Sequence, residues 1–177
     1  METFAPLRDA TAGYAREHRP LVAYAGLTVL FNLSVAGILL GTRSSGRYLP
    51  ERIGWGDVLL LGVATFKLSR LIAKDSVTSF VRAPFVAYER PAGDSEVNEK
   101  PRGTGWRLAL GELLTCPFCV GQWVAASFAG GLVVAPALTR FVGAIFALTA
   151  VADFLQLIYS AGKERRAGLE SRISLSL

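Results

Sequence analysis

Apolar positions gather in four long segments of the chain, and polar residues fill the connections between them. The four segments cover residues 21–41, 53–73, 120–139 and 141–159. Each has about the twenty residues that a helix needs to cross a hydrocarbon core of about 30 Å. The second is the least apolar, because Lys67 and Arg70 interrupt it, and only Arg140 separates the third from the fourth, with Pro136 near their turn. The pattern predicts an all-α fold, a single four-helix membrane domain over residues 21–159.

The polar connection between the second and third helices divides into three predicted pieces. They are an interfacial arm over residues 76–88, a mobile loop over residues 90–105 and a short amphipathic helix over residues 106–115. In the arm, Phe80 and other apolar residues recur at helical spacing, so it should lie flat in the membrane interface with a break at Pro84. The loop is rich in Pro, Gly and charged residues and has little to bury, which is typical of a solvated segment.

Composition agrees with a membrane protein. Hydrophobic residues make up 51% of the 177 positions and charged residues only 19%, a balance that few water-soluble domains show. The net charge of +5 does not indicate a nucleic-acid partner, because the basic residues lie at the ends of the apolar segments and form no basic face with interleaved aromatics. The bilayer is the expected partner.

The distribution of Lys and Arg predicts the orientation. The N-terminal segment (residues 1–20), the middle connection and the basic tail (residues 160–177) share one side, and the two short connections share the other. The first side carries thirteen basic residues and the second carries four, which are Arg43, Arg47, Arg52 and Arg140. Because basic residues favour the cytoplasmic side, both termini should be cytoplasmic in a multi-pass protein of the bacterial inner membrane.

Three charged residues should share one level within the membrane. Lys67 and Arg70 lie on one face of the second helix, and Asp153 is the single acid of the fourth. A rise of about 1.5 Å per residue places all three about 15 to 20 Å from the outer surface. One interpretation is an ion, proton or anionic-headgroup site, and the other is a structural ion pair with Lys and Arg heads reaching the interface. The match in depth predicts that Asp153 pairs with Lys67 or Arg70.

The only two cysteines, Cys116 and Cys119, form a C-x-x-C pair that leads into the third apolar segment. They are candidate redox thiols, because the start of a helix stabilises a thiolate. They are also candidate zinc ligands if a second chain supplies another thiol pair, since His18 is the only histidine. The third interpretation is a tight helix-start turn with packed thiols. Apart from this possible zinc ion, no cofactor is expected.

Other sequence features bear on catalysis and on assembly. The chain has no phosphate-binding Walker loop, no H-E-x-x-H motif and no nucleophile, histidine and acid set, so we assign no catalytic residue. Gly121 and Ala125 begin a series of small residues at every fourth position, and Gly143 and Ala147 form another. Such spacing lets membrane helices touch. It predicts close packing of the last two helices, and a homodimer is the alternative.

Several short motifs together resemble one bacterial family. They are R-L-I before an acid (Arg70 to Ile72, then Asp75), R-x-P (Arg82 to Pro84) and C-P-x-C-x-G-x-W (Cys116 to Trp123). The combination resembles the domain-of-unknown-function 1360 family of small integral membrane proteins. The likeness covers about residues 58–159, with Lys67 and Gln122 where the family pattern often has arginine and an aromatic residue. The resemblance implies membrane location and a shared core of Arg70, Asp75, Arg82, Cys116, Cys119, Gly121 and Trp123, and no established activity.

Three functions remain open from the sequence. The first is a non-enzymatic membrane scaffold or accessory protein whose cytoplasmic face, with Arg82, the interfacial aromatics and the basic tail, engages anionic lipid or a protein partner. The second is a membrane thiol oxidoreductase or thiolate-metal protein that uses Cys116 and Cys119. The third is a small transporter or proton path along Lys67, Arg70 and Asp153.

Overall fold

The computed structural model describes residue 14, residues 19–46 and residues 48–174, with side chains placed through residue 167. The described part is mostly helical and contains six helices and one β-hairpin. The helices are α2 (Leu21–Ser44), α3 (Trp55–Lys74), α4 (Ser79–Arg82), α5 (Gly105–Thr115), α6 (Pro117–Val134) and α7 (Pro136–Ser174), and the strands are β1 (Val86–Gly93) and β2 (Glu96–Pro101). Three helices, α2, α6 and α7 as far as Ala167, are long and apolar enough to cross a membrane.

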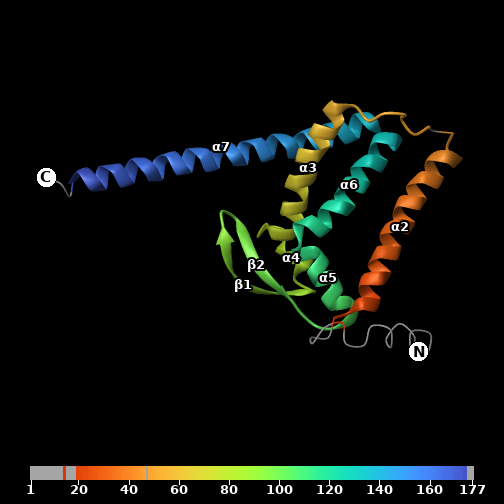
Figure 1. The fold of residues 1–177 in the computed structure, drawn as a ribbon, viewed down its shortest axis with the longest axis horizontal. Coiled ribbons are helices and arrows are strands. Elements are labelled where there is room, and N and C mark those ends of the chain that lie inside the picture. Colours follow the sequence, from red (N-terminus) through yellow and green to blue (C-terminus); the bar gives the residue numbers. More distant parts are fainter. Residues whose placement is uncertain (1–13, 15–18, 47, 175–177) are drawn as a thin grey trace.

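Helix α3 lies at the centre of the bundle, where it packs against both α6 and α7 (Figure 1). Helix α2 stands on the other side of α6, and the long α7 crosses α3 and extends well beyond the other helices. The hairpin, α4 and α5 gather at one end of the bundle. We call residues 79–115, which comprise α4, β1, β2 and α5, the hairpin platform.

The core forms between α3 and α6. Val120, Val124 and Phe128 recur every fourth residue on α6, so they share one face, and they are buried against Leu61 and Ala64 of α3. The remaining surfaces of the long helices expose large apolar side chains. Examples are Leu33 and Leu40 on α2, Leu59 on α3, and Leu148, Leu155 and Ile158 on α7. Apolar side chains on the outside of long helices suit lipid, because lipid tails are as apolar as leucine.

The third and fourth predicted helices meet earlier than the sequence pattern indicates. The structure ends α6 at Val134 and begins α7 at Pro136, so the predicted boundary at Arg140 is wrong. Proline has no N–H to donate and disfavours helical geometry in the residue before it, so Ala135 is non-helical and α6 ends at Val134. Arg140 lies inside α7 and pairs with Asp57 at the start of α3, with N–O distances of 2.7 and 2.8 Å.

The prediction of a mobile loop over residues 90–105 is also wrong. Most of this segment belongs to an antiparallel hairpin, in which Val86 pairs with Pro101 and Gly93 with Glu96. The turn uses left-handed backbone at Gly93 (φ 119°) and Ser95 (φ 64°), which glycine adopts without strain. The prediction of an all-α fold is therefore corrected to a mostly helical one.

The interfacial arm is shorter than predicted. Within residues 76–88 the only helix is the single turn of α4, and Val86 already begins β1. The chain does turn at Pro84, between these two elements. Gly111 of the short helix α5 faces the base of the hairpin, where a Cβ atom would lie 2.7 Å from the carbonyl oxygen of Phe85. Contact this close leaves room only for glycine.

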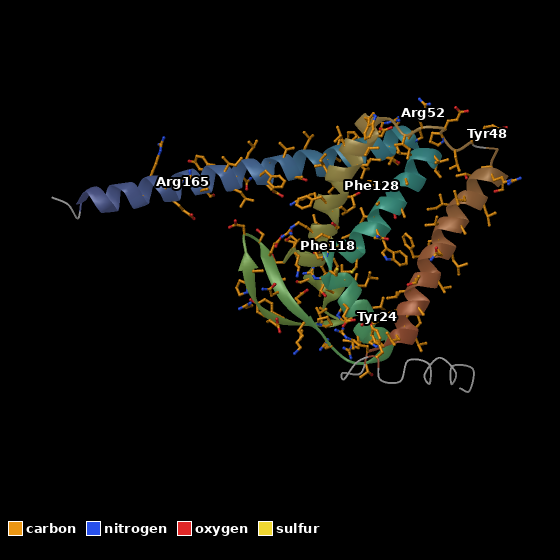
Figure 2. All side chains as sticks on the ribbon, in the orientation of Figure 1. Tyr24, Tyr48, Arg52, Phe118, Phe128 and Arg165 are labelled. Carbon is orange, nitrogen blue, oxygen red and sulfur yellow. The ribbon has the colours of Figure 1, made fainter. Side chains whose placement is uncertain are left out.

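The two ends of the bundle carry different groups. Figure 2 shows Tyr24 near the hairpin platform and places Tyr48 and Arg52 at the opposite end, in the connection between α2 and α3. Tyr24 and Arg19 both bond to Glu112 of α5, and the Arg19–Glu112 distance is 2.9 Å. This network joins the start of α2 to the platform.

Candidate functional site

The predicted charge cluster is only partly brought together. Lys67 Nζ lies 2.6 Å from Asp153 Oδ2, so α3 and α7 are joined by an ion pair at the level where the sequence places both charges. Side-chain exposure is 20% for Lys67 and 48% for Asp153. The pair therefore lies at the edge of the contact between the two helices and does not face a closed interior. Beside it, Phe66 stacks on Phe154 with ring centroids 5.9 Å apart.

Arg70 is not the partner of Asp153, which pairs with Lys67. Its guanidinium binds Glu96 at the start of β2, with Nη2 2.6 Å from both carboxylate oxygens. It also lies over the ring of Phe66, 5.9 Å from the centroid. One face of α3 thus carries two separate ion pairs, one toward α7 and one toward the hairpin.

Arg82 has a role that its sequence motif does not reveal. Its side chain is fully buried and forms an ion pair with the nearly buried Glu99, with Nε 2.5 Å from Oε2. Its two terminal nitrogens donate to the carbonyl oxygens of Ile72 (2.6 Å) and Asp75 (2.8 Å), at the end of α3. These carbonyls have no partner within the helix, so Arg82 satisfies them and ties the hairpin platform to α3.

Thr78 and Asp75 complete this connection. Thr78 Oγ1 donates to the carbonyl oxygen of Leu71 at 2.5 Å and accepts from Arg82 at 2.8 Å. Asp75 forms an isolated β-bridge with Glu96, and its carboxylate accepts from the N–H of Val77 at 3.2 Å. Asp75 and Arg82 therefore hold the backbone that leaves α3, and the fully buried Arg82 side chain is not free to bind a ligand.

The two thiols lie where α5 gives way to α6. Cys116 is the N-cap of α6, its Sγ accepts a hydrogen bond from the N–H of Cys119 at 3.3 Å, and Pro117 occupies the first turn. Cys116 is half-buried and Cys119 is exposed, and both are free thiols. The arrangement makes a helix-start turn with one accessible sulfur.

Nothing in the described part of the chain completes a metal site around these thiols, since no three His, Cys, Asp or Glu side chains gather there. Gly121 faces α3, where a Cβ atom would lie 3.9 Å from Ser69, an ordinary contact distance. Trp123 packs edge-on against Phe31 of α2, with ring centroids 5.2 Å apart. These two motif residues therefore mediate helix packing.

One small residue on each of the last two helices, Gly121 of α6 and Gly143 of α7, faces α3. A Cβ atom at Gly143 would lie 2.6 Å from Leu61 Cδ2, and Gly121 faces Thr65 and Ser69. The predicted packing of the last two helices on each other is made at Gly131, where a Cβ atom would lie 2.6 Å from Thr139 Oγ1, whereas Gly121 and Gly143 contact α3. Central placement of α3 explains this, because both helices must pack on it.

The acids that balance the basic motif residues were missed in the sequence. Glu96 and Glu99, the partners of Arg70 and Arg82, lie in the segment interpreted as a solvated loop. The sequence did offer one signal for these acids. Arg70 and Arg82 lie in or near apolar segments, where a cation needs an acidic partner.

Comparison with known proteins places most of this arrangement in one family. A family model described as "Protein of unknown function (DUF1360)" matches residues 60–159. These residues hold most of α3, the hairpin platform, α6 and the first part of α7. Sporulation protein YjcA of Bacillus subtilis is 29% identical over 107 residues, which cover 58% of this chain and 90% of the relative. UPF0713 protein YngL of the same organism is 26% identical over 113 residues, with 63% and 85% covered. No solved structure matches significantly.

Proposed function

The chain belongs to the DUF1360 family of proteins of unknown function, and on that premise we propose that it is a non-enzymatic scaffold of the bacterial inner membrane. In this proposal four helices cross the bilayer, both termini are cytoplasmic, and the hairpin platform is the cytoplasmic face that binds lipid or a protein partner. The observation that carries the proposal is the buried Arg82, which fixes a polar platform rigidly to the end of an apolar bundle.

Helix α3 is the proposed fourth span, beside the three helices that are apolar enough by themselves. Its 20 residues correspond to about 30 Å of helix, the thickness of a hydrocarbon core. Its charges are covered in part by ion pairs with Asp153 and Glu96. Contacts of this kind let a helix with ionisable residues cross a membrane, because its charges meet partners and avoid lipid.

Cysteine accessibility in intact cells tests this topology. In a Cys116→Ser, Cys119→Ser background, Ser45→Cys lies between α2 and α3, and Ser95→Cys lies at the hairpin turn. We expect a membrane-impermeant maleimide to label Ser45→Cys in intact cells and Ser95→Cys only after permeabilisation. If both positions react from one side, α3 does not span, and if only Ser95→Cys reacts in intact cells, the orientation is inverted.

A thiol protein is the second candidate, because Cys119 is exposed and adjoins a half-buried Cys116. Elemental analysis and thiol titration of the detergent-purified chain separate the two candidates. The scaffold proposal expects two titratable thiols, no stoichiometric zinc, and an unchanged oligomeric state after Cys116→Ser, Cys119→Ser. Zinc bound between two chains, or a disulfide that cycles with reductant, would support the thiol function instead. A transport path is not favoured, because separate ion pairs occupy Lys67 and Arg70.

A further inference from the structure

We propose that Arg102 and Arg107 form a headgroup site for an anionic phospholipid of the cytoplasmic leaflet. The inference rests on the proposed function, since it assigns the lipid-binding role of the platform to particular residues. Arg82 cannot have this role, because its side chain is fully buried. This corrects the sequence-based expectation that Arg82 belongs to the cytoplasmic face that engages anionic lipid or a protein partner.

The two guanidinium groups are both anchored to the turn that follows α4. Arg102 Nη2 donates to the carbonyl oxygen of Ala83 at 2.8 Å, and Arg107 Nε donates to that of Pro84 at 2.9 Å. These carbonyls belong to consecutive residues, whose Cα atoms are only about 3.8 Å apart. The backbone N–H of Arg102 also donates to the carbonyl oxygen of Phe85 at 3.0 Å. Two positive charges are thus fixed at a single turn.

Neither arginine is neutralised within the described part of the chain. The five ion pairs found there join other basic residues to Glu112, Asp153, Glu96, Glu99 and Asp57. Arg102 and Arg107 are both exposed, and each uses one N–H for its carbonyl, so the other donors remain for a ligand. Phosphate oxygens suit this arrangement, because the forked guanidinium binds them with two hydrogen bonds.

The neighbouring residues place this site at the surface of the bilayer. Trp106 lies directly before Arg107, and its ring packs on Gly26 of α2, where no side chain would fit. Gly26 is in the second turn of α2, about 8 Å along the helix from its first residue. Trp106 is 52% exposed, and tryptophan favours the level of the lipid headgroups. The two arginines therefore lie near the depth of the phosphates.

Exposed apolar side chains distinguish a phospholipid from a free phosphate as the ligand. Phe80 and Val81 of α4 precede the turn that holds the arginines, and their exposed fractions are 74% and 46%. With Trp106, they give the turn an apolar surface beside its two positive charges. A phospholipid has both complementary parts, an anionic headgroup and an acyl chain.

Lipid titration of the full chain, followed by native mass spectrometry from detergent, tests the site. We expect the Arg102→Gln, Arg107→Gln variant to bind phosphatidylglycerol at least about tenfold more weakly, because each basic residue near an anionic surface contributes a factor of about five. The matched control is Arg43→Gln, Arg52→Gln, which removes two exposed charges from the last turn of α2 and from the connection between α2 and α3, at the opposite end of the bundle from the site (Figure 2). We expect the control to change the affinity less than twofold.

Further variants and ligands identify the class of ligand and distinguish a lost binding site from a misfolded chain. The Arg102→Lys, Arg107→Lys variant keeps the charge and loses the forked geometry, so its affinity should fall between those of wild type and the Gln variant. Phosphatidylcholine should show no dependence on these residues, and inorganic phosphate should not displace phosphatidylglycerol. Equal losses in the site and control variants, an unchanged Gln variant, or complete displacement by phosphate would overturn the inference. If phosphatidylglycerol binding does not depend on Arg102 and Arg107, but Ser45→Cys and Ser95→Cys label as expected, only this inference is overturned. Inverted labelling of the two cysteines overturns the proposed function.

Discussion

The buried ion pair between Arg82 and Glu99 gives the most demanding prediction. Arg82→Met removes the ion pair and the bonds to the carbonyl oxygens of Ile72 and Asp75 together. Glu99, with a side-chain exposure of 4%, then keeps a charge without a partner. Removing one partner of a buried pair typically costs about 3 to 5 kcal/mol. We therefore expect the hairpin platform to detach from α3 more readily, with the apolar bundle retained.

Hydrogen exchange of the detergent-solubilised chain, read from peptides that cover β1 and β2, measures this local opening. Since each 1.4 kcal/mol is a factor of about ten, amide exchange in the hairpin should accelerate by about 10² to 10³ fold or more. The upper limit is the exchange rate of the fully open hairpin. The Arg82→Met, Glu99→Met variant should be less affected than Arg82→Met alone, because no charge is left buried. Arg90→Met changes an exposed residue of β1 and should stay within about 0.5 kcal/mol.

The reasoning is refuted by either of two results. Exchange in Arg82→Met within twofold of wild type would mean that Arg82 does not hold the platform. Equal acceleration in the single and double variants would mean that the uncompensated charge of Glu99 contributes nothing, so that only the lost carbonyl bonds matter.

Two further predictions test the contacts of α3 and α5. Asp153→Asn should lower the thermal stability in detergent or lipid, because it leaves Lys67, whose side chain is 20% exposed, without its ion-pair partner; if α3 spans the membrane as proposed, an unpaired lysine there costs about 2.5 to 3.5 kcal/mol. Adding Lys67→Met should restore part of the loss, and strictly additive losses would exclude the pairing. Gly111→Ala should destabilise the chain by about 1 to 3 kcal/mol, because its Cβ atom would lie 2.7 Å from a backbone oxygen of Phe85, whereas Gly121→Ala should be neutral or stabilising, as a helical alanine is favoured over glycine by about 1 kcal/mol. Equal melting temperatures for the two alanine variants would contradict the packing of α5 on the hairpin.

The sequence alone determined the features that depend on local composition. Long apolar segments place α2, α6 and much of α7, because a helix that meets lipid must be apolar along its length. A helix-start turn was one of three interpretations of the C-x-x-C pair, and Cys116 is the N-cap of α6. The motif residues also identified the family, since they lie within the matched residues 60–159.

Only the tertiary structure decided what the polar segments do. An isolated two-stranded hairpin is marginally stable in water, and this one is supported by contacts with α3 and α5. Because these contacts stabilise it, its own residues can have the composition of a loop. Depth along a helix predicted that Lys67 and Asp153 share a level, but it could not show that Arg70 turns toward Glu96. The burial of Arg82 depends on carbonyls left free at the end of α3, and a carbonyl carries no sequence signal, because every residue has one.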